Sequence, residues 1–151
     1  MLPGFDAKKA AHVAAYFALK SGGSINVLKL SKLLYLAERE SMRLYGEPMF
    51  YDRLVSMDHG PVTSITLNLI NGDTQSPMWS EVIAPRRNYS VKARTGTVVE
   101  RLDQLSKADI SILDGLWRRF KSFDQYRLRD WTHNNCPEWK DPNGSSVSIR
   151  G

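Results

Sequence analysis

The 151 residues of this chain fit a single domain, and 42% apolar residues are enough for one hydrophobic core. A net charge of +5 favours an anionic partner, either nucleic acid or an acidic protein surface. The single cysteine, Cys136, excludes an internal disulfide, and no stretch approaches the roughly 20 apolar residues that span a bilayer. Because the N-terminus also lacks the apolar run of a signal peptide, we expect a cytoplasmic protein with no membrane partner.

Two amphipathic helices are predicted at the start of the chain. The first follows Asp6, a good N-cap, and ends before Gly22-Gly23. The second follows Asn26 and runs to Tyr45, with Gly46 after its last turn. Two apolar lines predict that this second helix packs from two sides. One line is Val27, Leu30, Leu33, Leu34, Ala37 and Leu44, and the other is Leu28, Tyr35 and Met42.

The middle of the chain predicts shorter elements. Residues 50–57 read as an extended segment, and the turn His59-Gly60-Pro61 places a proline at the start of a short helix over 62–69. Two β-strands are predicted over 79–84 and 89–92, joined by a hairpin loop. These strands would form a small antiparallel sheet.

Two further helices are predicted near the C-terminus. Ser106 and Asp109 form a capping box at the start of the first, and the second begins near Asp124 and ends around Trp131. Residues 143–146 should be disordered. The sequence therefore predicts a mainly helical α+β single domain with a small antiparallel β-sheet over residues 1–140, followed by a disordered tail over 141–151.

The sequence lacks a set of residues that would carry catalysis or bind a metal. Cys136 lies near His133, but one cysteine and three histidines are too few for a typical zinc site. No glycine-rich phosphate loop is present. We expect no catalytic residue, no metal and no cofactor. Nucleic-acid binding stays open as an alternative, although the densest basic groups are only pairs, Arg86-Arg87 and Arg118-Arg119.

Three blocks of the sequence resemble the Panacea domain of SocA-like antitoxins. The first, from Leu30 to Ala37 and on through residues 44–50, contains the lysine-leucine-leucine-tyrosine helix of that family. The second, His59-Gly60-Pro61-Val62, is similar to its glycine-proline-valine turn. The third, Thr132-His133 followed by Pro137-Glu138-Trp139, looks like its closing motif. The resemblance covers roughly residues 8 to 140.

This resemblance implies a non-enzymatic antitoxin of bacteria or phages that neutralises a protein toxin, encoded nearby, by direct binding. Some relatives deliver the toxin to a protease, so a protease or chaperone is a further implied partner. Because the family pairs with unrelated toxins, the sequence does not identify the chemistry of the toxin.

The polar face of the second helix is the predicted partner-binding surface. On this face Leu36 is surrounded by long charged side chains, an arrangement typical of an interface anchor with a polar rim. The alternative is a solvated face with one incidental apolar residue. The residues expected to bind the partner are Lys29, Lys32, Leu36, Arg39, Glu40, Arg43 and His59.

Overall fold

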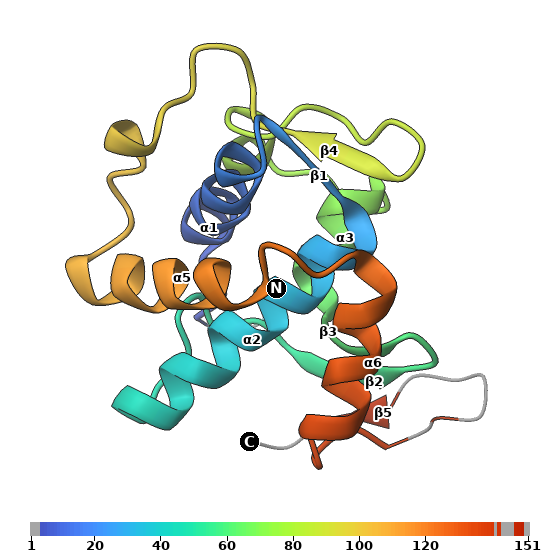
Figure 1. Cartoon of the computed structure of the whole chain (residues 1–151). Helices are drawn as coiled ribbons and strands as arrows, with labels where there is room; N and C mark the ends of the chain where they lie inside the picture. The colour runs from blue at the N-terminus through green and yellow to red at the C-terminus, as the bar shows by residue number, and fades with distance from the viewer. Residues whose placement is uncertain (1–3, 141, 143–146, 150–151) are drawn as a thin grey trace.

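Helix α2 (Val27–Tyr45) forms the centre of the molecule (Figure 1). In the computed structural model, which describes residues 4–140, 142 and 147–149, the other helices and strands pack around it. Helices α1 (Ala7–Lys20), α5 (Lys107–Phe120) and α6 (Gln125–Asn135) and strands β1 (Ser24–Asn26) and β3 (Gly60–Thr63) all contact α2. Residues 30–38 are consequently all buried, including the predicted core residues Leu33 and Tyr35.

The four long helices begin where the sequence predicts. The side chains of Asp6, Asn26, Ser106 and Asp124 each accept a hydrogen bond from the backbone N–H three residues later, and Ser106 and Asp109 complete the predicted capping box. Helix α6 continues four residues beyond the predicted end at Trp131. Thr132, in this additional turn, is fully buried, so tertiary packing extends the helix.

Two small antiparallel sheets complete the α+β fold, and the predicted fold class is confirmed. Strand β1 pairs with β4 (Ser90–Lys92), and β2 (Leu54–Met57) lies between β3 and β5 (Val147–Ser148). Strand β5 lies within residues 141–151, the segment for which the sequence predicts a disordered tail. Residues 143–146 lie outside the described part of the chain.

Two predicted elements differ from the structure. Pro61 belongs to β3, an edge strand in which a missing N–H is tolerated, and helix α3 (Ser64–Asn71) starts three residues later. Asp52 fixes that start, because its carboxylate accepts hydrogen bonds from the N–H groups of Ile65 and Thr66. The predicted strand 79–84 is reduced to a single antiparallel bridge between Ile83 and Ala93; helix α4 (Pro77–Ser80), with proline in its first turn, begins this segment instead.

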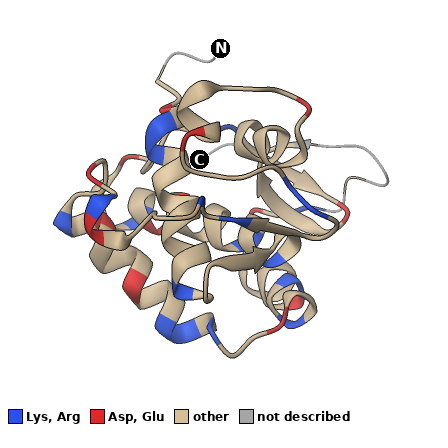
Figure 2. Ribbon diagram, turned by 90° about the horizontal axis from the view of Figure 1, so that it is seen from above, with Lys and Arg blue, Asp and Glu red and all other residues tan. Residues whose placement is uncertain are grey.

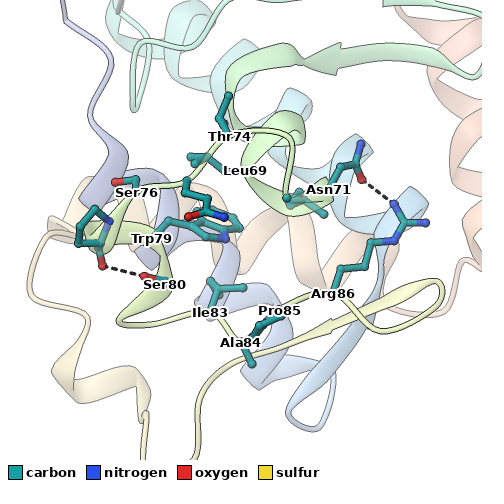
Figure 3. Close-up of a pocket in the computed structure, with 14 residues that line it drawn as sticks. Leu69, Asn71, Thr74, Ser76, Trp79, Ser80, Ile83, Ala84, Pro85 and Arg86 are labelled. Atoms are coloured by element: carbon teal, nitrogen blue, oxygen red, sulfur yellow. Dashed lines mark hydrogen bonds between the residues drawn. The ribbon is translucent and has the colours of Figure 1, made fainter.

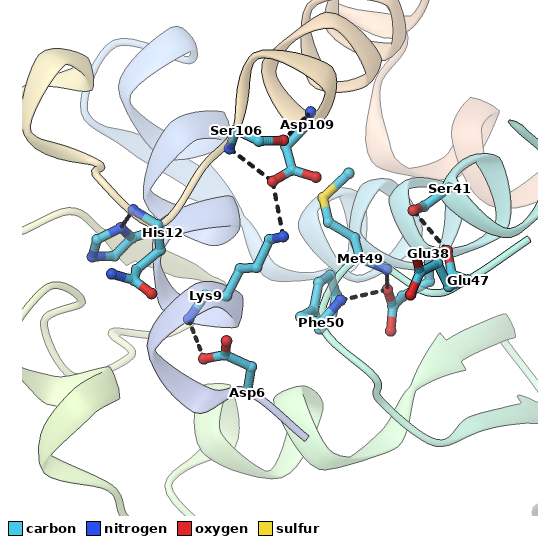
Figure 4. Close-up of polar contacts among 11 residues, drawn as sticks. Asp6, Lys9, His12, Glu38, Ser41, Glu47, Met49, Phe50, Ser106 and Asp109 are labelled. Carbon is cyan, nitrogen blue, oxygen red and sulfur yellow. Dashed lines mark hydrogen bonds and ion pairs between the residues drawn. The ribbon is translucent and has the colours of Figure 1, made fainter. Parts of the chain in front are cut away.

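An ion pair connects α1 to the start of α5. Lys9 Nζ lies 2.8 Å from Asp109 Oδ2, and the same oxygen accepts the backbone N–H of Ser106 in the capping box (Figure 4). The loop that precedes α5 contains the 3-10 helix η1 (Val99–Arg101). Within the described residues, no helix combines the length and the apolar character needed to cross a bilayer.

Glu38, the last residue of the buried run 30–38, holds the chain that follows α2 against the middle of that helix (Figure 4). Its Oε1 accepts the N–H groups of Met49 at 2.5 Å and Phe50 at 2.9 Å, and its Oε2 accepts that of Asp52 at 2.7 Å. Burial raises the pKa of Glu38 to about 7, although the three N–H donors act in the opposite direction. One buried carboxyl group therefore sets the path of the chain into β2.

We predict that Glu38→Ala lowers the free energy of unfolding by about 3 kcal/mol or more, because three backbone N–H groups lose their acceptor. Glu38→Gln keeps one side-chain oxygen for Met49 and Phe50 and should cost less. Urea unfolding of both variants measures this difference. Equal stability of the two variants would contradict the assigned role.

Candidate functional site

Lys32 lies in the second turn of α2, and its side chain is 0% exposed. Its Nζ donates a hydrogen bond to the carbonyl oxygen of Pro61 in β3, at 3.0 Å. Among the described residues, none of the ion pairs involves Lys32. Burial lowers the pKa of Lys32 to about 7, with Arg129 acting in the same direction and Cys136 against it. This amine therefore titrates near neutral pH.

The segment after α6 folds back against Lys32 and the turn between β2 and β3. The ring of Trp139 stacks on that of His133 with centroids 4.1 Å apart, and its Nε1 donates to the carbonyl oxygen of Met57 at 2.8 Å. Gly60, in the turn between β2 and β3, lies against His133 and Lys32 and has a backbone φ of 107°. A Cβ at Gly60 would lie 3.1 Å from His133 Nε2 and 3.2 Å from Lys32 Nζ. The glycine thus permits both the backbone conformation and the close approach.

One turn along α2, a second polar cluster joins that helix to the same segment. Glu138 Oε2 accepts the hydroxyl of Tyr35 at 2.5 Å and lies 2.6 Å from Nε of Arg39. Burial and the bond to Glu138 raise the pKa of Tyr35. Burial acts to raise the pKa of Glu138, but the contacts with Tyr35 and Arg39 hold it below its ordinary value. The structure thus joins the three sequence blocks around Lys32 and Tyr35.

Two cations on the polar face of α2 bind helix C-termini of the same chain. Lys29 Nζ donates to the carbonyl oxygen of Lys121, which caps α5, at 3.0 Å and lies over the ring of Trp117. Arg39 Nη2 donates to the carbonyl oxygen of Asn135, the last residue of α6, at 3.3 Å. Cations at these positions complement the partial negative charge of the helix ends.

The expected exposure of Lys32 and Leu36 is wrong. Lys32 is fully buried and Leu36 is 3% exposed. The physical reason is that β3 and α6 pack over Lys32, whereas Leu36 lies against α5 and α6. Leu36 therefore belongs to the core, and the apolar periodicity of α2 alone gives no sign of this third contact.

The remaining predicted residues divide between two surfaces. Leu36, Arg39, Glu40 and Arg43 line a groove of about 420 Å³ between α2 and α5, here called the α2–α5 groove. Its other lining residues are Leu44, Tyr45, Ser111, Ile112, Gly115, Leu116, Arg119, Phe120 and Trp131. Glu40 and Arg43 form an ion pair with each other. His59 is exposed and lines a different pocket together with Lys32.

That second pocket, here called the α2–α6 pocket, has a volume of about 450 Å³. It lies where the first turns of α2 and α6 meet the β2–β3 turn. Its lining residues are Asn26, Val27, Leu28, Ser31, Lys32, Met57, His59, Val62, Leu67, Asn71, Arg86, Tyr89, Gln125, Tyr126 and Arg129. Sequence analysis selects Lys32 and His59 among them but does not place them in one cavity.

A third cavity, also of about 450 Å³, lies between α3, α4 and the chain from Ile83 to Arg86 (Figure 3). Trp79 and Ile83 are largely buried within it. Arg86 is the one charged residue among its lining residues, and its Nη1 donates to Oδ1 of Asn71 at 2.5 Å. Arg86 and Asn71 line both this cavity and the α2–α6 pocket. The cavity itself offers no pair of groups for acid–base chemistry.

The charge distribution and the reactive side chains give little sign of a nucleic-acid site or a nucleophile. Lys and Arg positions are spread over several elements with Asp and Glu among them (Figure 2). Burial raises the pKa of Cys136 to about 11, so the group is a thiol at neutral pH rather than the nucleophilic thiolate. Within the described part of the chain, no three His, Cys, Asp or Glu side chains gather as a metal site would require.

We predict that Gly60→Ala lowers stability by about 1–3 kcal/mol more than Gly23→Ala does. Both glycines have similar φ, 107° and 110°, but a Cβ at Gly23 meets nothing within 4 Å. The difference therefore measures crowding against His133 and Lys32. Thermal unfolding of the two variants tests it, and equal losses would show that backbone conformation alone requires glycine at Gly60.

We also predict that stability rises with pH above about pH 7 because of Lys32. The unfolded chain keeps this proton up to an ordinary pKa of 10.5, whereas the folded chain releases it near 7. Between these values the unfolded state binds more protons, so raising the pH favours folding. Urea unfolding between about pH 6 and pH 9 should show this rise in the native chain and a smaller rise in Lys32→Met. An identical pH dependence in both proteins would refute the prediction.

Comparison with known protein families identifies the family to which this chain belongs. The family model for the SocA-like antitoxin, Panacea domain, matches residues 30–140. The matched region starts in α2 and ends just after Trp139, so it contains both polar clusters described above. The comparisons with curated proteins and with solved structures each gave no significant match. Because the match covers well over half of the chain, the chain belongs to the family of SocA-like antitoxins with a Panacea domain.

Proposed function

We propose that this protein is an antitoxin that neutralises a protein toxin by binding it directly, and that it acts without catalysis. The observation that carries this proposal is the match of residues 30–140 to the antitoxin family. The geometry agrees with it, because Lys32, His133 and Glu138 serve to hold elements of the fold together. Cys136 is a buried thiol with a raised pKa, which is a poor nucleophile.

The exposed end of α2 is the proposed toxin-binding surface. Leu44 and Tyr45 are 49% and 56% exposed, and Arg43 precedes them on the same turn. Tyrosine and arginine are the residue types that contribute most to the affinity of protein interfaces, and an apolar residue at the centre of the contact excludes water. Arg39 and Glu40 extend this surface into the α2–α5 groove. Lys29 is left out because it already binds the end of α5.

Charge would act mainly on the rate of encounter. The chain has a net charge of +5, and Arg43 and Arg119 both line the α2–α5 groove. A positive surface speeds association with an acidic toxin in a salt-dependent way, whereas the apolar contact slows dissociation. The two contributions can therefore be separated in kinetic measurements.

We predict that Leu44→Asp abolishes growth rescue when the antitoxin is co-expressed with the product of a toxin gene next to its own. Dissociation of the purified complex should become at least about tenfold faster, because a charge replaces an apolar contact. Arg43→Glu should instead slow association, most strongly at low salt. Surface plasmon resonance measures both rates.

Met78→Asp is the matched control for this experiment. Met78 is exposed to a similar degree but lies on α4, and it lines neither groove. The Met78→Asp variant should leave both the association and dissociation rates and the growth rescue unchanged. All three variants should keep the native melting temperature. If the native chain neither binds the toxin nor rescues growth, the proposed function is wrong. If it does both and Leu44→Asp binds normally, only the proposed surface is wrong.

A further inference from the structure

The α2–α6 pocket has a strongly one-sided charge. Its described lining includes three basic residues, Lys32, Arg86 and Arg129, together with His59, and no Asp or Glu. The whole chain contains 21 basic and 16 acidic residues, so a lining of 15 residues without an acid departs from the average of the chain. A pocket with this lining favours an anionic ligand.

Lys32 supplies a buried amine at this pocket, which carries a positive charge below about pH 7. Burying an ammonium group without a carboxylate partner is costly, and hydrogen bonds or a counter-charge must offset the cost. An ammonium group has three donors, and the described structure gives Lys32 one acceptor, the carbonyl oxygen of Pro61. Because Lys32 is 0% exposed, it acts on an anion in the pocket through its positive potential and not through direct contact.

Arg129 and the N-terminus of α2 add to the positive potential in the pocket. Arg129 is bonded through its Nε to the exposed Asp130 at 3.1 Å, and its terminal nitrogens make no hydrogen bond among the described residues. The first turns of α2 and α6 both line the pocket and lie side by side in Figure 1. The N-terminus of α2, which the neutral Asn26 caps, carries partial positive charge that favours an anion, whereas the Asp124 carboxylate offsets this charge at α6.

The rest of the lining is apolar or aromatic. Val27, Leu28, Val62 and Leu67 form apolar parts of the wall, and Tyr89 and Tyr126 lie at the rim with largely exposed rings. A volume of about 450 Å³ lies in the range of pockets that bind small molecules or a single inserted residue. The pocket therefore has room for an apolar body next to the anionic group.

We propose that the α2–α6 pocket binds a carboxylate that carries an aliphatic or aromatic body, with Arg129 binding the carboxylate and the buried charge of Lys32 favouring it. Such a group comes either from a free small molecule or from the C-terminal residue of a protein. This inference goes beyond the proposed antitoxin function. It is independent of the toxin and of the α2–α5 groove.

The test is an NMR titration of the full chain with four probes. Two are carboxylates, 4-methylpentanoate and N-acetyl-leucine, and two are their neutral counterparts, 4-methylpentanamide and N-acetyl-leucinamide. The carboxylates should bind with roughly millimolar affinity and shift the backbone amides of residues 27–32 and 125–129. Tighter binding of N-acetyl-leucine would identify a protein C-terminus as the source, and tighter binding of 4-methylpentanoate a free small molecule. Equal affinities would support the shared chemistry.

Variants on α6 and α2 make the result specific. Arg129→Gln should weaken carboxylate binding about tenfold, because a charged hydrogen bond is lost. Arg127→Gln, the same change on the same helix outside the pocket, should have no effect. Lys32→Met, which removes the buried charge, should also weaken binding. Equal shifts from the neutral probes, shifts spread over the molecule, or unchanged affinity in Arg129→Gln would each overturn the proposal.

Discussion

The burial of α2 on all sides is the constraint on which the rest of the structure depends. Nine consecutive residues, from Leu30 to Glu38, are buried, and this run includes an amine and a carboxyl group. Polar groups removed from water must find partners within the protein. Lys32 finds the carbonyl oxygen of Pro61, and Glu38 finds three backbone N–H groups. These bonds fix where the chain enters β2 and where β3 lies, so the helix organises the sheet through its polar residues.

The same constraint explains how the C-terminal part of the chain is held. Arg39 and Tyr35 bind Glu138, and Trp139 stacks on His133 and bonds to the β2–β3 turn. The contacts of Glu138 join residues 99 and 103 positions apart in the sequence, and the bond from Trp139 to Met57 joins residues 82 apart. Closing such a long loop has an entropic cost that several simultaneous contacts must offset. The contacts of Glu138 and Trp139 therefore serve to hold the C-terminal segment against the rest of the domain.

Burial of the middle of α2 also decides where partners can bind. A face that is covered by α5 and α6 offers no surface, so the exposed parts of this helix lie at its two ends. At the C-terminal end, Leu44 and Tyr45 project beside the α2–α5 groove. At the N-terminal end, the first turn opens into the α2–α6 pocket. The C-terminal end presents Leu44 and Tyr45 beside charged side chains, and the N-terminal end presents a basic cavity. The two ends therefore suit different ligands.

The sequence by itself determined the starts of the four long helices, the α+β class and the family, because capping residues, helical periodicity and the three sequence blocks are local signals. Only the tertiary structure decided that Pro61 lies in an edge strand and that Asp52 sets the start of α3, since both depend on partners distant in sequence. The tertiary structure also decided that Lys32 and Leu36 are buried. A charged residue at helical spacing usually faces solvent, and nothing local to α2 shows that β3 and two later helices cover these two residues.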